Sequence, residues 1–164
     1  MTTHMQKEGN ETLHVMVVDD DSVCRDYLAR LLEAAGVRAF QARNGAELLA
    51  LLSHQEIDCI VLDYNLGEET GLGIYQQLKE ALQDPPPVVM LTGEGRDSTI
   101  IEALRGGMSD YLSKHDLTRD KLLRAVRDAV HRKTEERVQR DEIERLKREV
   151  SATAARPFGR RDTQ

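Results

Sequence analysis

Five polar or charged side chains stand at the ends of short apolar segments of the sequence. Between them, these side chains can bind a cation, attack as a nucleophile and donate a hydrogen bond. They are Asp19, Asp20, Asp63, Thr92 and Lys114. If the fold brings them together, the three carboxylates repel one another and need a cation or a proton at neutral pH. Oxygen ligands of this kind favour a hard ion such as Mg²⁺, which one or two carboxylates can hold.

Phosphoryl transfer to a carboxylate is the reaction that this set of groups suits best. Asp63 could act as the nucleophile and give an aspartyl phosphate. Lys114 would supply a mobile positive charge for the phosphoryl oxygens, and Thr92 would supply a hydroxyl donor. Phosphoryl transfer depends mainly on positioning and on the neutralisation of charge. The five groups together provide both.

Five apolar runs predict that these residues stand at the ends of β-strands. The runs are residues 13–18, 37–41, 59–62, 88–91 and 111–112. Continuous apolar runs are typical of strands covered on both faces, and helical patterns alternate with them. We therefore predict an α/β fold, with a doubly wound, five-stranded parallel sheet and a C-terminal helix extension. In such a sheet, ligand chemistry lies beyond the C-terminal ends of the strands.

The segments between the apolar runs have helical spacing. Asp21 and Asn44 are expected to cap the first two helices, and the prolines at 85–87 prevent the third helix from continuing. A fourth helix is expected within residues 97–107, and Thr118 opens a long fifth helix. Five strands thus alternate with five helices.

Four motifs at the ends of the predicted strands resemble those of the receiver domain of two-component response regulators. They are Asp19-Asp20, Leu62-Asp63-Tyr64-Asn65-Leu66, Leu91-Thr92-Gly93-Glu94 and Asp110-Tyr111-Leu112-Ser113-Lys114. The spacing agrees, because 43 residues separate Asp20 from Asp63, and steps of 29 and 22 residues lead on to the threonine and the lysine. The resemblance covers about residues 13–130 and implies the flavodoxin-like (βα)5 receiver fold.

The resemblance implies a role for each residue that would meet the phosphoryl group. Asp63 would be phosphorylated by a histidine kinase or a histidine phosphotransfer protein. Thr92 and Lys114 would bind the phosphoryl group. Tyr111 would be the switch aromatic that turns inward when Thr92 moves toward the phosphate, although plain core packing of Tyr111 is an alternative.

The resemblance also implies a magnesium site. Asp20 would ligate Mg²⁺ directly, and Asp19 would act beside it, partly through water. Asp63 would be a further ligand, and Asn65 would offer its backbone carbonyl. The sequence departs from the family at His115, because a proline in a cis peptide usually follows the lysine. That change removes no group that the transfer needs.

The uneven charge distribution suggests a body and a tail with different roles. The net charge is −11 over residues 1–118 and +5 over residues 119–164. The expected organisation is a disordered N-terminus at 1–11, a receiver domain at 12–130, a helical extension at 131–150 and a disordered tail at 151–164.

The helical extension carries part of a heptad pattern. Ile143, Leu146 and Val150 fit an apolar seam, but Glu136 and Gln139 occupy the seam positions before them. The pattern allows either a short coiled coil that dimerises or a solvated linker helix. In the first case the helix would pass the state of the receiver to a partner or to an output domain.

The sequence does not predict a membrane or exported protein. No apolar run approaches the roughly 18–20 residues that a membrane span needs, and residues 1–11 lack the pattern of a signal peptide. Cys24 and Cys59 have no metal-like spacing, and we expect reduced core thiols in a cytoplasmic protein. No helix-turn-helix pattern follows the receiver segment, so we expect no sequence-specific nucleic-acid binding within this chain.

The sequence therefore predicts a regulatory phosphoacceptor rather than an enzyme. Phosphorylation of Asp63 would switch dimerisation or partner binding, through the face of the fourth helix, fifth strand and fifth helix and through the C-terminal helix. The expected partners are the phosphodonor, a downstream effector or output domain, and a second copy of the chain. Two alternatives stay open, a phosphorylation-independent scaffold and an aspartyl-nucleophile phosphohydrolase. That hydrolase class has a second aspartate where this chain has Asn65.

Overall fold

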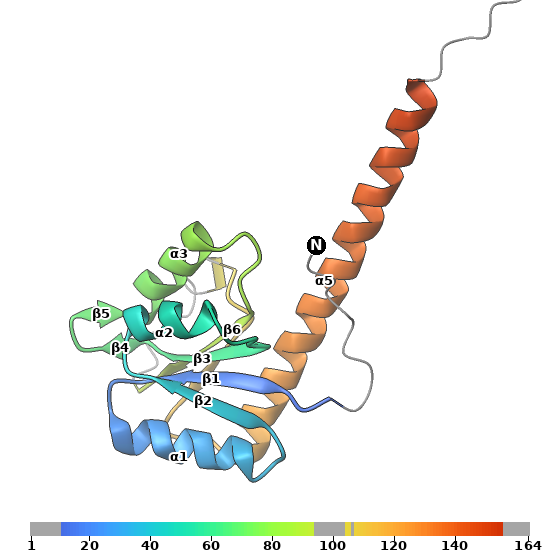
Figure 1. Ribbon diagram of the computed structural model, residues 1–164. Coiled ribbons are helices and arrows are strands. Elements are labelled where there is room, and N and C mark those ends of the chain that lie inside the picture. Colours follow the sequence, from blue (N-terminus) through green and yellow to red (C-terminus); the bar gives the residue numbers. More distant parts are fainter. Residues whose placement is uncertain (1–10, 94–103, 106, 156–164) are drawn as a thin grey trace, which may run out of the picture. The chain divides into compact units, whose positions relative to one another are not determined.

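Five parallel strands form the main sheet of the computed structural model, which describes residues 11–93, 104–105 and 107–155. The strands are β1 (His14–Val18), β2 (Arg38–Ala42), β3 (Cys59–Asp63), β6 (Val88–Thr92) and β7 (Asp110–Ser113). They lie in the order β2-β1-β3-β6-β7 (Figure 1). Because all neighbouring pairs are parallel, the C-terminal ends of the strands meet at one edge. The predicted fold class is confirmed.

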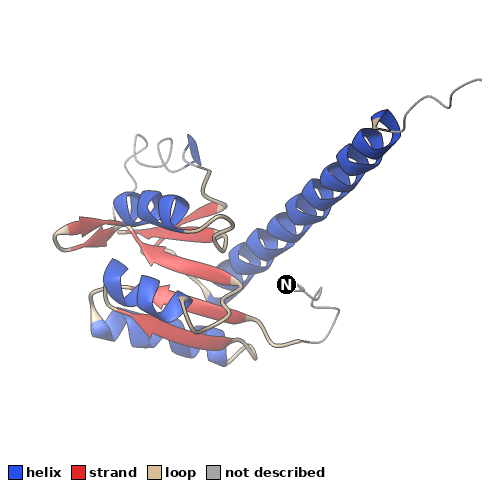
Figure 2. Cartoon of the chain, turned by 45° about the horizontal axis from the view of Figure 1, so that its top comes forward, coloured by secondary structure: helices blue, strands red, loops and turns tan. Residues whose placement is uncertain are grey.

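Helices cover both faces of the sheet (Figures 1 and 2). The longer described helices are α1 (Ser22–Glu33), α2 (Gly45–Leu52), α3 (Gly71–Ala81) and α5 (Arg119–Ala154). Successive residues of a strand point to opposite faces. Val15 and Val17 of β1 therefore belong to one apolar core, with residues of α1 and the start of α5. Met16 and Val18 belong to the other core, with residues of α2 and α3.

Two predicted helix caps are confirmed. Asp21 accepts hydrogen bonds from the backbone N–H groups of Val23 and Cys24, at 2.9 and 3.4 Å. Asn44 Oδ1 accepts one from the N–H of Glu47 at 2.9 Å. Side chains of this type satisfy N–H groups that have no partner inside the helix. The Asp21 cap fixes the start of α1 at Ser22, three residues after Asp19.

A short antiparallel ribbon, which the sequence did not predict, follows β3. β4 (Asn65–Leu66) pairs with β5 (Glu69–Thr70). Gly67, between them, has a φ of +74°, a conformation that L side chains rarely adopt. The ribbon ends at Thr70, which caps α3 by accepting a hydrogen bond from the N–H of Gly73 at 3.1 Å. This ribbon therefore sets the path of the chain directly after Asp63.

Contacts divide the chain into two units, residues 1–130 and 131–164, and α5 contributes to both. In the first unit, Leu122, Val126 and Ala129 of α5 are fully or almost fully buried in the core shared with α1. Their spacing of four and three residues places these side chains on one apolar side of the helix.

The second unit is helical to Ala154, four residues beyond the expected end of the extension at Val150. The expectation of a disordered tail from Ser151 is therefore wrong for residues 151–154. Thr153 belongs to the last turn, and its hydroxyl donates a hydrogen bond to the carbonyl oxygen of Glu149 at 2.9 Å. The helix continues here through small residues, at the place where the sequence predicted the start of a tail.

Some sequence predictions lie outside the described residues. They include most of the expected fourth helix, Glu94, and the parts of the predicted disordered segments 1–11 and 151–164 that fall at residues 1–10 and 156–164. Across the described parts of the chain, none of the helices is long and apolar enough to cross a membrane.

Candidate functional site

Four of the candidate residues stand at or directly after the C-terminal end of a strand of the main sheet. Asp19 follows β1, and its N–H donates to the carbonyl oxygen of Ala42 at 3.2 Å. Asp63 and Thr92 are the last residues of β3 and β6. Lys114 follows β7, and its N–H donates to the carbonyl oxygen of Thr92 at 2.8 Å. The backbone ladder thus carries all these side chains to the same edge, as the sequence predicted.

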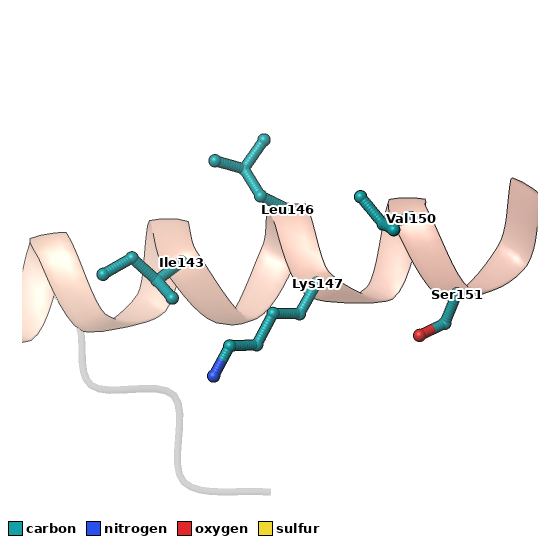
Figure 3. A pocket seen from close by; sticks show the side chains of 5 residues that line it. All are labelled: Ile143, Leu146, Lys147, Val150 and Ser151. Carbon is teal, nitrogen blue, oxygen red and sulfur yellow. The ribbon is translucent and has the colours of Figure 1, made fainter.

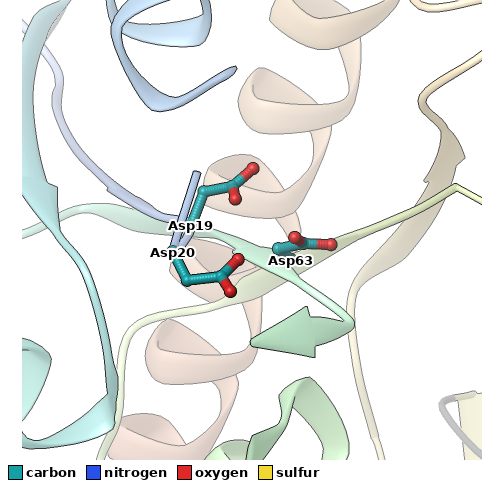
Figure 4. Close-up of side chains that lie close together, drawn as sticks. All are labelled: Asp19, Asp20 and Asp63. Atoms are coloured by element: carbon teal, nitrogen blue, oxygen red, sulfur yellow. The ribbon is translucent and has the colours of Figure 1, made fainter. Parts of the chain in front are cut away.

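Three carboxylates cluster at this edge (Figure 4). Asp19, Asp20 and Asp63 each offer an oxygen, and these oxygens all lie within 4.8 Å of one another. Asp19 and Asp63 are buried, whereas Asp20 is exposed. A cluster of oxygen donors with one open side fits Mg²⁺, which retains several water ligands. The donor set therefore agrees with the magnesium site that the sequence predicted.

Lys114 connects the two buried carboxylates. Its Nζ lies 3.0 Å from Oδ2 of Asp19 and 3.0 Å from Oδ2 of Asp63. The lysine side chain is 25% exposed, so it reaches the pair from the solvent edge of the site. One positive charge thus faces two negative charges, and the cluster keeps an excess of negative charge even before Asp20 is counted.

The two buried carboxylates have opposite shifts in pKa. Burial raises the pKa of Asp63 to about 6, and the negative charge of Asp19 adds to the shift, while the hydrogen bond from Lys114 opposes it. Burial acts in the same direction on Asp19, but hydrogen bonds from Lys114 and the N–H of Asp21 outweigh it and lower the pKa. Burial alone would lower the pKa of Lys114, but its bonds to both aspartates raise it. Asp63 is therefore the member of the pair that gives up its proton last.

Thr92 and Tyr111 are joined by a hydrogen bond. The Thr92 hydroxyl donates to the phenolic oxygen of Tyr111 at 3.1 Å. Thr92 is buried, and Tyr111 is partly buried. If Thr92 turned toward a group on Asp63, its hydroxyl would have to give up the hydrogen bond to Tyr111.

Asn65 contacts Asp63 through its backbone. Its N–H donates to Oδ1 of Asp63 at 3.3 Å. Oδ2 of Asp63 faces Lys114, so each oxygen of this carboxylate has one protein donor. Each oxygen keeps a further lone pair for a metal or a phosphorus atom.

Gly71 makes the close approach behind Asp63 possible. A Cβ atom at position 71 would lie 2.6 Å from the carbonyl oxygen of Asp63, closer than real Cβ atoms come to other atoms. The N–H of Gly71 also donates to the carbonyl oxygen of Tyr64 at 2.6 Å. The sequence did not predict this contact of Gly71 with the backbone of Asp63.

Two residues of α1 near Asp19 were not predicted as part of the site. Arg25 Nη1 donates to the carbonyl oxygen of Asp19 at 2.9 Å. Burial, together with the neighbouring Asp19 carboxylate, raises the pKa of Cys24 to about 11. The sequence could have indicated both contacts, because Cys24 and Arg25 lie in the first turn of a helix that Asp21 caps. Side chains of a helix point back toward its N-terminus, and here that direction leads to Asp19.

Both cysteines are free thiols, as predicted. Burial raises the pKa of Cys59 to about 12, so this thiol stays protonated in the core at neutral pH.

The sequence of residues 15–127 matches the response regulator receiver domain family. The chain belongs to this family. The aerobic respiration control protein ArcA of Escherichia coli is 33% identical over 115 residues, which make up 70% of this chain and 48% of ArcA. The phosphate regulon transcriptional regulatory protein PhoB of Pseudomonas aeruginosa is 32% identical over 101 residues, or 61% of this chain and 44% of PhoB. The chain thus spans about half the length of the curated relatives it matches.

Solved structures give the same assignment. A response regulator from Thermotoga maritima has a TM-score of 0.65 at 28% identity, and the match covers 74% of this chain and 99% of that one. A CheY-like receiver domain protein from Methanospirillum hungatei has a TM-score of 0.68 at 20% identity, over 77% and 99% of the two chains, and supports the fold alone. The resemblance inferred from the four motifs is confirmed.

Receiver domains are regulatory phosphoacceptors rather than classical enzymes, and they work with histidine kinases. In this receiver, Asp19, Asp20 and Asp63 form an acidic pocket that is consistent with a phosphoacceptor site.

Proposed function

We propose that this receiver accepts a phosphoryl group on Asp63 from a histidine kinase or a histidine phosphotransfer protein, and that the modification switches dimerisation or partner binding. The observation that carries the proposal is the position of Lys114, whose Nζ lies 3.0 Å from both Asp19 and Asp63. A phosphoryl group on Asp63 would bring anionic oxygens to the place where this ammonium already lies.

The transfer would exchange one bond to phosphorus for another. An oxygen of Asp63 attacks the phosphorus atom of the phosphohistidine and forms a P–O bond. The P–N bond breaks, and the imidazole leaves with its electron pair. Lys114 then neutralises charge on the phosphoryl oxygens, and the Thr92 hydroxyl is placed at a neighbouring strand end to donate to one of them. These roles of Thr92 and Lys114 are part of the proposal.

A bound Mg²⁺ would neutralise charge shared between the aspartates and the phosphoryl oxygens. Asp20, which is exposed, and Asp63 would be direct ligands, with the backbone carbonyl of Asn65. Both oxygens of Asp19 already accept hydrogen bonds, from the N–H of Asp21 and from Lys114, so an action partly through water suits it.

The output would begin at the hydrogen bond between Thr92 and Tyr111. If Thr92 turns toward a phosphoryl group, the phenol of Tyr111 loses its 3.1 Å contact and becomes free to adopt another rotamer. Tyr111 lies on β7, so the change would reach the face formed by the predicted fourth helix, β7 and α5. A downstream effector, an output domain or a second copy of the chain would sense this change.

The direct test is modification of the purified chain with acetyl phosphate and Mg²⁺, read as a mass increase of one phosphoryl group. We expect modification of the natural chain and none of Asp63→Asn. Beryllofluoride, a mimic of the phosphoryl group, should perturb the NMR signals of Thr92 and Lys114 in the natural chain alone. Absence of any change that depends on Asp63 would contradict the proposal. A chain whose partner binding is the same with Asp63→Ala would favour the scaffold alternative.

A further inference from the structure

An apolar stripe lies on the surface of the second unit. Ile143, Leu146 and Val150 of α5 are 52%, 47% and 69% exposed. Their spacing of three and four residues places them on one side of the helix. With Lys147 and Ser151 they line a shallow groove (Figure 3). Three large apolar side chains at successive turns on one side of a mostly charged helix indicate a surface that a partner covers.

The residue types of the stripe favour a coiled coil of two helices. In a heptad labelled a to g, Ile143 and Val150 take the a positions and Leu146 takes the d position between them. β-branched residues at a, combined with leucine at d, favour parallel dimers over trimers and tetramers. The stripe therefore specifies the number of helices as well as their contact side.

The charges on either side of the stripe determine which partner fits. The g positions are all acidic and the e positions are all basic over three heptads. They are Glu135, Glu142 and Glu149 at g, and Lys133, Arg140 and Lys147 at e. In a parallel dimer, each g residue faces the e residue five positions later on the partner helix. Glu135 then faces Arg140 and Glu142 faces Lys147, so a second copy of this same helix is complementary.

The same charges oppose other arrangements of two copies. In an antiparallel pair, g faces g and e faces e, which would place glutamates against glutamates and basic residues against basic residues. Glu142 is also bonded by Arg145 within its own helix, at 2.6 and 3.0 Å. Exposed pairs of this kind contribute little, so this bond does not prevent an interhelical pair.

We propose that a second copy of this chain covers the stripe, in a parallel two-stranded coiled coil whose apolar seam begins at Ile143. Glu136 and Gln139 take the a and d positions of the preceding heptad, so the seam is polar on that side and the apolar part is short. The dimer is accordingly weak, so a change in the state of the receiver can shift the equilibrium between monomer and dimer. This dimer would be the partner interaction of the proposed function. Only the control of the dimer by phosphorylation of Asp63 rests on that proposed function.

Sedimentation of the full chain over a concentration series up to millimolar tests the seam. Leu146→Ser should weaken the dimer at least about tenfold, as expected for loss of the central apolar side chain. Val138→Ser is the matched control, because Val138 is 48% exposed on the same helix but lies off the seam. A chain that stays monomeric with and without beryllofluoride would overturn the inference, and so would equal effects of the two variants.

Charge exchange tests the pairing. Glu142→Lys and Lys147→Glu should each weaken the dimer several-fold, and an equimolar mixture of the two variants should restore association, because each unlike pair is then complementary. Glu144→Lys, with the same change of charge outside the e and g positions, should leave the dimer unchanged. A mixture that associates no better than its components would overturn the inference.

Cross-linking tests the orientation. Thr153→Cys, at a d position near the end of α5, should form a disulfide between two copies under mild oxidation, whereas Asp141→Cys, on the outer side, should not. Cross-linking of both variants alike would overturn the parallel arrangement. Modification of Asp63 is read by mass in the same samples. A dimer that dissociates with Leu146→Ser but never carries a phosphoryl group would therefore contradict the proposed function and leave this inference standing.

Discussion

The ammonium of Lys114 lies 3.0 Å from Oδ2 of Asp63, although 51 residues separate the two in the sequence. The same Nζ contacts Asp19 at an equal distance. Without a metal, this single cation holds together two buried carboxylates that would otherwise repel each other.

Lys114→Met should destabilise the fold at neutral pH by about 2–4 kcal/mol, because two buried carboxylates lose their shared counter-charge. The loss should shrink as the pH falls below about 6, where Asp63 takes up a proton. Urea denaturation of the natural chain and the variant at several pH values measures the difference. Lys121→Met is the control, since Lys121 pairs with exposed Asp116 and should change stability little. Equal losses in the two variants would contradict the bridging role of Lys114.

Asp63→Asn should stabilise the metal-free fold above pH 6 by about 1–2 kcal/mol. The pKa of Asp63 is raised from an ordinary value of 3.8 to about 6, so the folded state binds the proton more tightly than the unfolded state does. Stability of the natural chain therefore falls as the pH rises from about 4 to 6, and the variant lacks this fall. Denaturation curves without divalent cations at pH 4 and pH 7.5 test it. A variant less stable than the natural chain at pH 7.5 would contradict the shift.

The affinity for Mg²⁺ should depend on pH through the same carboxyl. Below about pH 6 the metal competes with a proton on Asp63, so the apparent affinity should fall up to about tenfold for each further pH unit. Above pH 7 the affinity should be nearly constant. Isothermal titration calorimetry across this range measures the change. Asp20→Asn should weaken binding at every pH without removing the pH dependence, because Asp20 is the exposed member of the cluster.

The sequence could predict that the site residues converge, because their convergence depends only on the order and the parallel direction of the strands. Apolar runs alternating with helices imply a parallel sheet, and a parallel sheet brings Asp19, Asp63 and Lys114 to one edge. The contact of Arg25 with the carbonyl of Asp19 could not be predicted, because it depends on the rotamer of one long side chain. The close approach of Gly71 to Asp63 depends on the β4–β5 ribbon, whose two-residue strands carry too little pattern to be detected.

Gly71→Ala should destabilise the fold by about 1–3 kcal/mol and displace Asp63. The added Cβ would lie 2.6 Å from the carbonyl oxygen of Asp63 and 3.0 Å from Cα of Tyr64, and both are backbone atoms that cannot turn aside. Gly93→Ala is the control, because a Cβ at position 93 meets nothing within 4 Å. Thermal denaturation and the rate of modification by acetyl phosphate should both change for Gly71→Ala alone. A Gly71→Ala variant as stable and as reactive as the control would show that the backbone behind Asp63 can move.

Tyr111→Phe should preserve or increase the affinity for beryllofluoride, whereas Thr92→Ala should decrease it. In the metal-free protein the Thr92 hydroxyl donates to the Tyr111 phenol at 3.1 Å, and binding of a phosphoryl mimic would require Thr92 to exchange that partner. A phenylalanine removes the competing acceptor, so the hydroxyl is already available, and the cost to stability should be about 1 kcal/mol. Titration followed by NMR measures both affinities. A large loss of affinity in Tyr111→Phe would mean that the phenol helps to hold Thr92 in the binding position, and the switch proposed for this pair would then be wrong.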